Sequence, residues 1–176
     1  MVARIVSAAT PDPGVLWVAS SMPVRDLDAV MPLSERRTRV LANRGANGID
    51  GFVSTVLGSA AVSGTATVAL AGDLSVLHDV GALATAARLS VPVTIVTINN
   101  DGGGIFHLLP QAGGPHFERH WGTAHGLELS AVARALGVES EIVTDARRLA
   151  ELVCTTPRGP RFVEVPTDRL ENAELH

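Results

Sequence analysis

The sequence predicts an α/β fold, in which one doubly wound, mainly parallel sheet of about six strands carries helices on both faces. Two observations lead to this prediction. Short apolar runs alternate along the chain with alanine-rich segments of helix length, which is typical of repeated strand–helix–strand units. Polar and glycine-rich stretches follow the apolar runs, at the place where ligands bind in open parallel sheets.

The first expected strand, residues 15–19, is a continuous apolar run, as a buried strand requires. The helix expected next, at 24–30, has Pro23 at its start and Pro32 beyond its end, where proline is best tolerated. The same alternation continues to the end of the chain, with strands expected at 39–42, 65–71, 91–98, 141–143 and 161–165, and helices at 52–62, 76–89, 129–136 and 146–154.

Composition narrows the possible functions. A length of 176 residues fits a single domain, which we expect to span residues 1–176. All 14 basic residues are arginine, so chemistry that requires a lysine Schiff base or a P-loop lysine is excluded for this chain. A net charge of −4 indicates neither nucleic acid nor a membrane as a partner. Cys154 is the single cysteine and is expected to be buried, and we expect a cytoplasmic location.

Oxygen ligands and glycines follow two neighbouring predicted strands. Asp73 comes directly after one strand, and Asn100 and the glycines 102–104 come after the next. A carboxylate, an amide oxygen and a backbone carbonyl suit a hard divalent cation, and consecutive glycines let backbone N–H groups approach a phosphate. The helix that begins near Ser75 adds its positive end. This pattern favours a diphosphate bridged to Mg²⁺ over two ordinary strand-capping turns.

Two of these motifs resemble a signature of the thiamine diphosphate enzymes, which begins Gly-Asp-Gly and ends Asn-Asn. Here Gly72-Asp73-Leu74 and Asn99-Asn100 enclose residues 75–98, with Leu74 in place of the last glycine. With Ser20–Asp26 and Asn43–Gly51, the sequence is similar to the menaquinone-pathway branch of that family. The resemblance covers roughly residues 14 to 168. It implies the C-terminal, diphosphate-binding domain of a three-domain enzyme.

The resemblance also implies residue roles. Asp73 and Asn100 match metal ligands for Mg²⁺ or Mn²⁺, together with the carbonyl of Gly102, and Ile49 matches an apolar residue that bends thiamine diphosphate. Other residues match positions around this cofactor: Ser20, Ser21, Met22, Asn47, Gly48, Gly72, Leu74, Ser75 and Gly104. The remaining set matches substrate contacts, with arginines for carboxylates and an apolar wall: Arg25, Arg44, Ile105, Phe106 and Leu109.

The reaction implied is decarboxylation of 2-oxoglutarate and addition of the resulting carbanion to isochorismate. In this family a glutamate from the N-terminal domain of a partner subunit assists the cofactor. We therefore expect no catalytic residue in this chain, no synthase activity from the chain alone, and a homodimer or homotetramer when the enzyme is full length. We also expect the chain to be trimmed at both ends and to lack a final helix.

Alternative functions remain. Another thiamine diphosphate-dependent decarboxylase or carboligase, acting on monocarboxylate substrates, would not need both Arg25 and Arg44. The chain could also be a non-catalytic module that kept a diphosphate site. A dinucleotide-binding domain lacks support, because no Gly-x-Gly-x-x-Gly follows the first strand. The histidines at 116, 120 and 125 have no standard zinc spacing. We expect them to be solvated or to lie near the substrate.

Overall fold

The computed structural model describes residues 1–32 and 34–175 and contains one six-stranded sheet. The strand order is β2-β1-β3-β4-β6-β5, and every neighbouring pair is parallel. This confirms the predicted fold class. The strands are β1 (Gly14–Val18), β2 (Arg39–Leu41), β3 (Ala66–Gly72), β4 (Val93–Asn99), β5 (Glu139–Ile142) and β6 (Pro160–Pro166).

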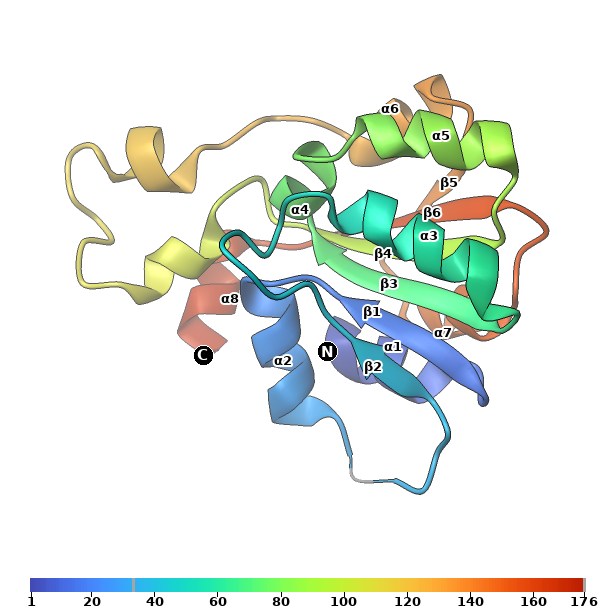
Figure 1. Cartoon of the computed structure of the whole chain (residues 1–176). Helices are drawn as coiled ribbons and strands as arrows, with labels where there is room; N and C mark the ends of the chain where they lie inside the picture. Colours follow the sequence, from blue (N-terminus) through green and yellow to red (C-terminus); the bar gives the residue numbers. More distant parts are fainter. Residues whose placement is uncertain (33, 176) are drawn as a thin grey trace.

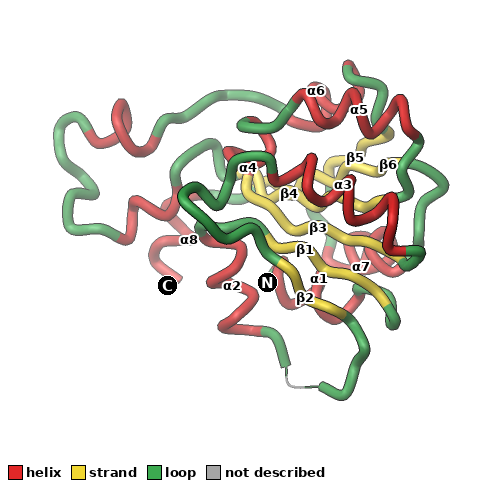
Figure 2. Tube along the Cα trace, viewed as in Figure 1, coloured by secondary structure: helices red, strands yellow, loops and turns green. Residues whose placement is uncertain are grey.

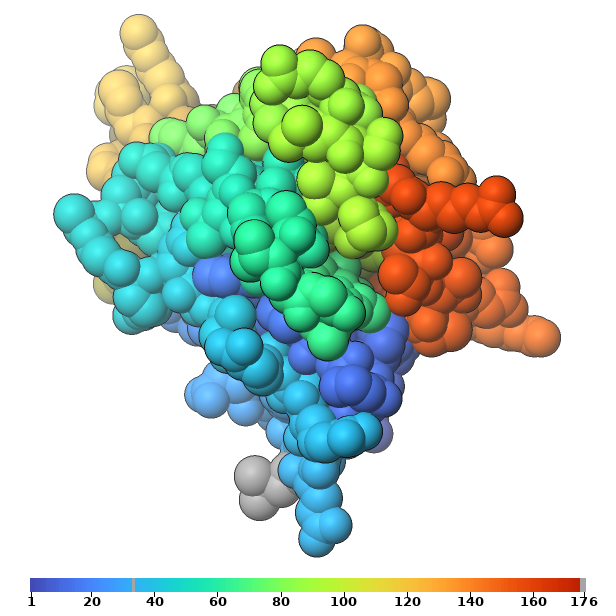
Figure 3. Space-filling view, turned by 45° about the vertical axis from the view of Figure 1, so that its right-hand side comes forward, coloured from blue at the N-terminus to red at the C-terminus, as the bar shows by residue number. Residues whose placement is uncertain are grey.

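Helices cover both faces of the sheet, as Figures 1 and 2 show. One face carries α3 (Phe52–Ser63), α5 (Gly81–Leu89) and α6 (Leu129–Ala135), and the first two of these dominate the view in Figure 3. The other face carries α1 (Val2–Ala9), α2 (Met22–Val30) and α7 (Ala146–Cys154). The remaining helices are α4 (Asp73–Leu77), η1 (Gly104–Leu108), η2 (Glu118–Gly122) and α8 (Arg169–Leu175).

The central strand β3 explains why both faces need a cover. Val68 and Leu70 point into the core beneath α1, α2 and α7, whereas Ala69 and Ala71 point into the core beneath α3 and α5. All four side chains are buried. Because successive side chains of a strand alternate between faces, a continuous apolar run leaves neither face free for water.

The chain reverses its direction across the sheet at β1. From β1 it runs to β2 on one side, and it then returns to pair β3 with the other side of β1. In a doubly wound sheet this arrangement separates the loops beyond the carboxyl ends of the two central strands, and the crevice between them is the usual ligand site. The crevice here lies between the loops that follow β1 and β3.

Two α-helices in the described part of the chain were not predicted. α1 packs Val2 and Val6, one helical turn apart, against the sheet. α8 forms where the chain was expected to lack a final helix, and Asp168 Oδ1 accepts hydrogen bonds from the N–H groups of Leu170 and Glu171 at its start. These two hydrogen bonds lower the pKa of Asp168, and the one from the N–H of Glu171 has the larger effect.

Other expectations need correction. The helix expected at 76–89 divides into α4 and α5, and the strand expected at 141–143 begins two residues earlier, at Glu139. Cys154 is exposed, not buried, because α7 turns Leu149 and Leu152 toward the sheet. Within residues 1–32 and 34–175, no helix has the length and apolar character that crossing a bilayer requires.

Candidate active site

One cavity of about 410 Å³ lies beyond the carboxyl ends of the central strands. It is built from the loops after β1, β2, β3 and β4, which are far apart in the sequence. Its lining includes every residue predicted to contact cofactor, metal or substrate except one: Ser20, Ser21, Met22, Arg25, Arg44, Asn47, Gly48, Ile49, Gly72, Asp73, Leu74, Ser75, Asn100, Gly102, Gly104, Ile105 and Phe106. Leu109 is the exception and is 41% exposed.

The predicted metal ligands meet where β3 and β4 end side by side. Asp73 is only 2% exposed, and its carboxylate Oδ2 accepts a hydrogen bond of 2.8 Å from the N–H of Gly102. Its Oδ1 accepts a hydrogen bond of 2.7 Å from the N–H of Leu74. The Gly102 contact ties the two loops together through the carboxylate that was predicted to bind the cation.

Asn100 provides the test of whether a cation fits here. Its side-chain Oδ1 is buried and has no hydrogen-bond partner among the described residues. A buried polar atom without a partner is rare in folded proteins and requires an explanation. A carboxylate, an amide oxygen and a nearby backbone carbonyl are the donors that Mg²⁺ prefers, so the residues present fit the predicted metal.

Glycines keep the cavity open where a side chain would close it. A Cβ on Gly48 would lie 2.1 Å from Ser20 Oγ, and one on Gly104 would lie 2.3 Å from Asn100 Nδ2. Gly102 also has a backbone φ of +127°, which other residues rarely adopt. The middle glycine of the run, Gly103, donates from its N–H to the carbonyl of Gly122 at 2.7 Å.

Two guanidinium groups border the cavity. Arg25, on α2, is exposed and donates from Nη1 to the carbonyl of Ser21 at 2.7 Å. Ser21 has a φ of +74°, an uncommon value for a residue other than glycine. Arg44, in the loop after β2, is exposed and makes no hydrogen bond or ion pair with the described part of the chain. Its donors are therefore available to a ligand.

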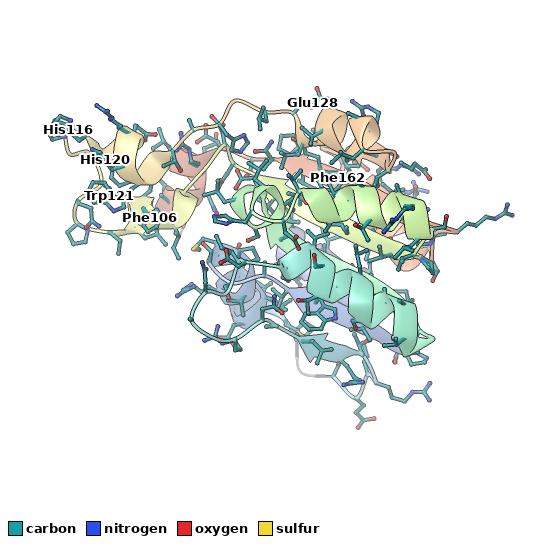
Figure 4. All side chains as sticks on the ribbon, turned by 45° about the horizontal axis from the view of Figure 1, so that its top comes forward. Phe106, His116, His120, Trp121, Glu128 and Phe162 are labelled. Atoms are coloured by element: carbon teal, nitrogen blue, oxygen red, sulfur yellow. The ribbon has the colours of Figure 1, made fainter. Side chains whose placement is uncertain are left out.

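The apolar side of the cavity comes from η1, which begins directly after the glycine run. Ile105 and Phe106 are half-buried there. Figure 4 places Phe106 near the base of the segment that projects away from the sheet, with His116 and His120 farther out on it.

No group of three or more histidine, cysteine or acidic side chains within residues 1–32 and 34–175 is arranged to hold a metal.

Several residues near the site were given no role in it from the sequence. Asn99 Oδ1 accepts from the N–H of Asp101 at 3.0 Å, and Asn99 Nδ2 donates to Glu164 Oε1 at 2.6 Å. The side chain of Asp101 in turn accepts from the backbone of residues 125 and 126. The Gly126 N–H is the main cause of a lowered pKa for Asp101, and the backbone N–H of His125 acts in the same direction. The run of polar residues after β4 was the only signal in the sequence.

A larger cavity, of about 570 Å³, lies between α2, β2 and the segment before β2. Its lining contains none of the residues predicted for the site. Arg36 lies at its wall, and the guanidinium group there donates to the carbonyls of Ser7 and Ala8 at the end of α1. We therefore assign the functional site to the smaller cavity, where the strand ends and oxygen donors converge.

Comparison with known proteins identifies relatives of the chain. Residues 29–165 match the family described as the thiamine pyrophosphate enzyme, C-terminal TPP binding domain. Two similar relatives are called 2-succinyl-5-enolpyruvyl-6-hydroxy-3-cyclohexene-1-carboxylate synthase. The one from Myxococcus xanthus is 49% identical over 99% of this chain, and the one from Rubrobacter xylanophilus is 45% identical over 99%. The chain spans 30% and 31% of their lengths.

Solved structures agree on the fold. The benzoylformate decarboxylase of Polynucleobacter necessarius superposes with a TM-score of 0.73 over 96% of this chain and 32% of its own, at 20% identity. A second structure, of a putative thiamin diphosphate-dependent enzyme from Mycobacterium smegmatis, superposes with a TM-score of 0.70. The match covers 95% of this chain and 31% of that chain, at 23% identity. The sequence match leads to one conclusion: this chain belongs to the thiamine pyrophosphate enzyme family, as its C-terminal TPP binding domain.

Proposed function

We propose that this chain is the cofactor-binding domain of a thiamine diphosphate- and Mg²⁺-dependent synthase that joins 2-oxoglutarate to isochorismate in menaquinone biosynthesis. The observation that carries the proposal is that one cavity gathers both kinds of group such an enzyme needs. Asp73 and the unpartnered Asn100 Oδ1 suit a cation beside a diphosphate. Arg25 and Arg44 suit the carboxylates of the substrates. The names of the relatives from Myxococcus xanthus and Rubrobacter xylanophilus support the same reaction.

In this proposal the role of the chain's own residues is to bind the metal ion and the cofactor and to orient them. Asp73, Asn100 and the Gly102 carbonyl would hold Mg²⁺ or Mn²⁺, and Ile49 would pack against thiamine diphosphate in the same cavity. When bound, thiamine diphosphate supplies the group that stabilises a carbanion. Ile105 and Phe106 keep water from the reacting centre, because their half-buried side chains form the apolar wall.

The arginines select the substrate. Arg44 has free donors, so binding a carboxylate there breaks no existing contact with the described residues. A planar guanidinium group binds a carboxylate through two parallel hydrogen bonds. A substrate with two carboxylates therefore benefits from both Arg25 and Arg44, whereas a monocarboxylate substrate benefits from one.

The same proposal assigns the rest of the catalytic unit to other parts of the intact protein. The chain spans about 30% of the length of the relatives from Myxococcus xanthus and Rubrobacter xylanophilus. We infer that the glutamate that assists the cofactor comes from the N-terminal domain of a partner subunit, within a homodimer or homotetramer. The 176-residue chain alone is then expected to have no synthase activity. Turnover of both substrates by the purified chain would contradict this assignment.

Calorimetric titration of the intact protein with thiamine diphosphate, with and without Mg²⁺, tests the cofactor assignment. We expect metal-dependent binding in the natural protein and its loss in Asp73→Ala, because that change removes the single predicted carboxylate ligand. Asp79→Ala is the matched control, since Asp79 lies beyond α4 and bonds to Ser54 instead. Unchanged affinity in Asp73→Ala would refute the metal site.

A further inference from the structure

The segment that returns from the projecting loop runs directly alongside the predicted metal loop. The N–H of Gly103 donates to the carbonyl of Gly122, and Asn99 Nδ2 donates to the carbonyl of Leu127 at 3.0 Å. Asp101 Oδ1 accepts from the N–H groups of His125 and Gly126, at 2.9 and 2.7 Å. The backbone of residues 122–127 is therefore held against residues 99–103 at several points.

This arrangement brings one histidine to the carboxylate of Asp73. His125 Nε2 lies 3.2 Å from Asp73 Oδ2, and the His125 side chain is 11% exposed while that of Asp73 is 3% exposed. The other ring nitrogen, Nδ1, lies 3.0 Å from the backbone nitrogen of Leu127. A backbone N–H can only donate, so Nδ1 accepts there. The ring proton of the neutral tautomer is then on Nε2, which donates to Asp73.

Counting lone pairs identifies what this contact does. An ionised carboxylate offers about two acceptor positions on each oxygen. Asp73 Oδ2 accepts from two groups, the N–H of Gly102 and Nε2–H of His125. Oδ1 accepts only from the N–H of Leu74 among the described residues, so it keeps one position free. His125 thus commits Oδ2 to the protein and leaves Oδ1 as the oxygen for a cation.

We propose that His125 is a positioning residue for the metal site, which fixes the Asp73 carboxylate so that Oδ1 alone serves the cation. The inference rests on the proposed function, because it assumes that Asp73 binds Mg²⁺. Groups that hydrogen-bond to metal ligands orient them, and their removal lowers metal affinity by roughly 10–100-fold. His125 reaches Asp73 from a segment that contributes no predicted ligand of its own.

The test measures metal affinity in the intact protein at saturating thiamine diphosphate, by Mn²⁺ electron paramagnetic resonance and by Mg²⁺ calorimetry. His125→Leu removes the hydrogen-bond donor and is expected to lower the affinity for the metal by about 10–100-fold. His125→Gln keeps an N–H donor at the end of a side chain of similar reach and is expected to restore affinity to within about threefold of the natural protein. His116→Ala is the control, since His116 is exposed on the same projecting segment.

The outcomes separate this inference from the function on which it rests. If the metal binds weakly to His125→Leu and its affinity recovers in His125→Gln, the positioning role of His125 is supported. A hydrogen-bond donor would not restore affinity that was lost through packing alone. Natural affinity in His125→Leu overturns the role of His125 while leaving the metal site intact. Absence of any metal-dependent signal from the natural protein overturns the metal site and the role of His125 together.

Discussion

Glu164 allows the sharpest test of the structure, because it is a buried carboxylate that joins two segments. It lies on β6, is 3% exposed, and accepts at both oxygens. Oε1 accepts from Asn99 Nδ2 and Oε2 accepts from the N–H of Ser130, each at 2.6 Å. Both partners are donors. The isosteric change Glu164→Gln therefore leaves one oxygen to accept and turns an NH₂ group toward the second donor.

The expected loss follows from that mismatch. A hydrogen bond to a charged group contributes about 1.5–3 kcal/mol, and a buried donor left without an acceptor carries a similar penalty. We expect Glu164→Gln to lower the free energy of unfolding by about 2–3 kcal/mol. At roughly 2–4 °C per kcal/mol for a chain of this size, the thermal midpoint falls by about 4–12 °C.

Urea and thermal unfolding of the natural protein and the variant measure this loss. Glu139→Gln is the matched control, because Glu139 is an exposed carboxylate on the neighbouring strand β5. It should change stability by no more than about 0.5 kcal/mol. Equal midpoints for Glu164→Gln and Glu139→Gln would refute the argument that both oxygens of Glu164 act as buried acceptors.

Three further changes test other parts of the site. Arg44→Ala should raise KM for a dicarboxylate substrate with cofactor affinity almost unchanged, and equal loss of both in steady-state kinetics and calorimetry would place Arg44 elsewhere. Gly102→Ala would put a Cβ 2.1 Å from the carbonyl oxygen of Gly122, so we expect a loss of about 1–3 kcal/mol in urea unfolding; the control Gly58→Ala, in open space on α3, should be neutral or stabilising. Arg169→Met removes donors to Glu118 and Gly122, so tryptic cleavage after Arg119 should quicken by about tenfold; the same rate as in Arg147→Met would argue against this contact.

Part of the site was predictable because it depends on short-range order. A motif that directly follows a parallel strand lies at the carboxyl edge of the sheet, whatever the rest of the chain does. This is why the positions of Asp73 and Asn100 along the chain were enough to predict that they lie together, and why Ser20 and Gly48 line the same cavity. Their roles toward cofactor and metal stay predictions.

Other features depend on contacts between distant residues. His125 reaches Asp73 across 52 positions of the chain, and Glu164 reaches Asn99 across 65. Nothing in the local pattern around His125 distinguishes it from His116 or His120. The prediction for Cys154 was wrong for a related reason, since its exposure depends on the phase with which α7 meets the sheet.

The sequence by itself determined the doubly wound parallel sheet, the strand ends that carry chemistry and the resemblance to thiamine diphosphate enzymes. Apolar periodicity and strand-end motifs are local properties, so they can be recognised along the chain without its fold. Only the tertiary structure decided that Asn100 Oδ1 has no partner among the described residues, that Arg44 is free of contacts with them, and that His125 contacts Asp73. Each depends on how loops that are distant in the sequence pack together, and the His125 contact depends on how the projecting segment returns to the sheet edge.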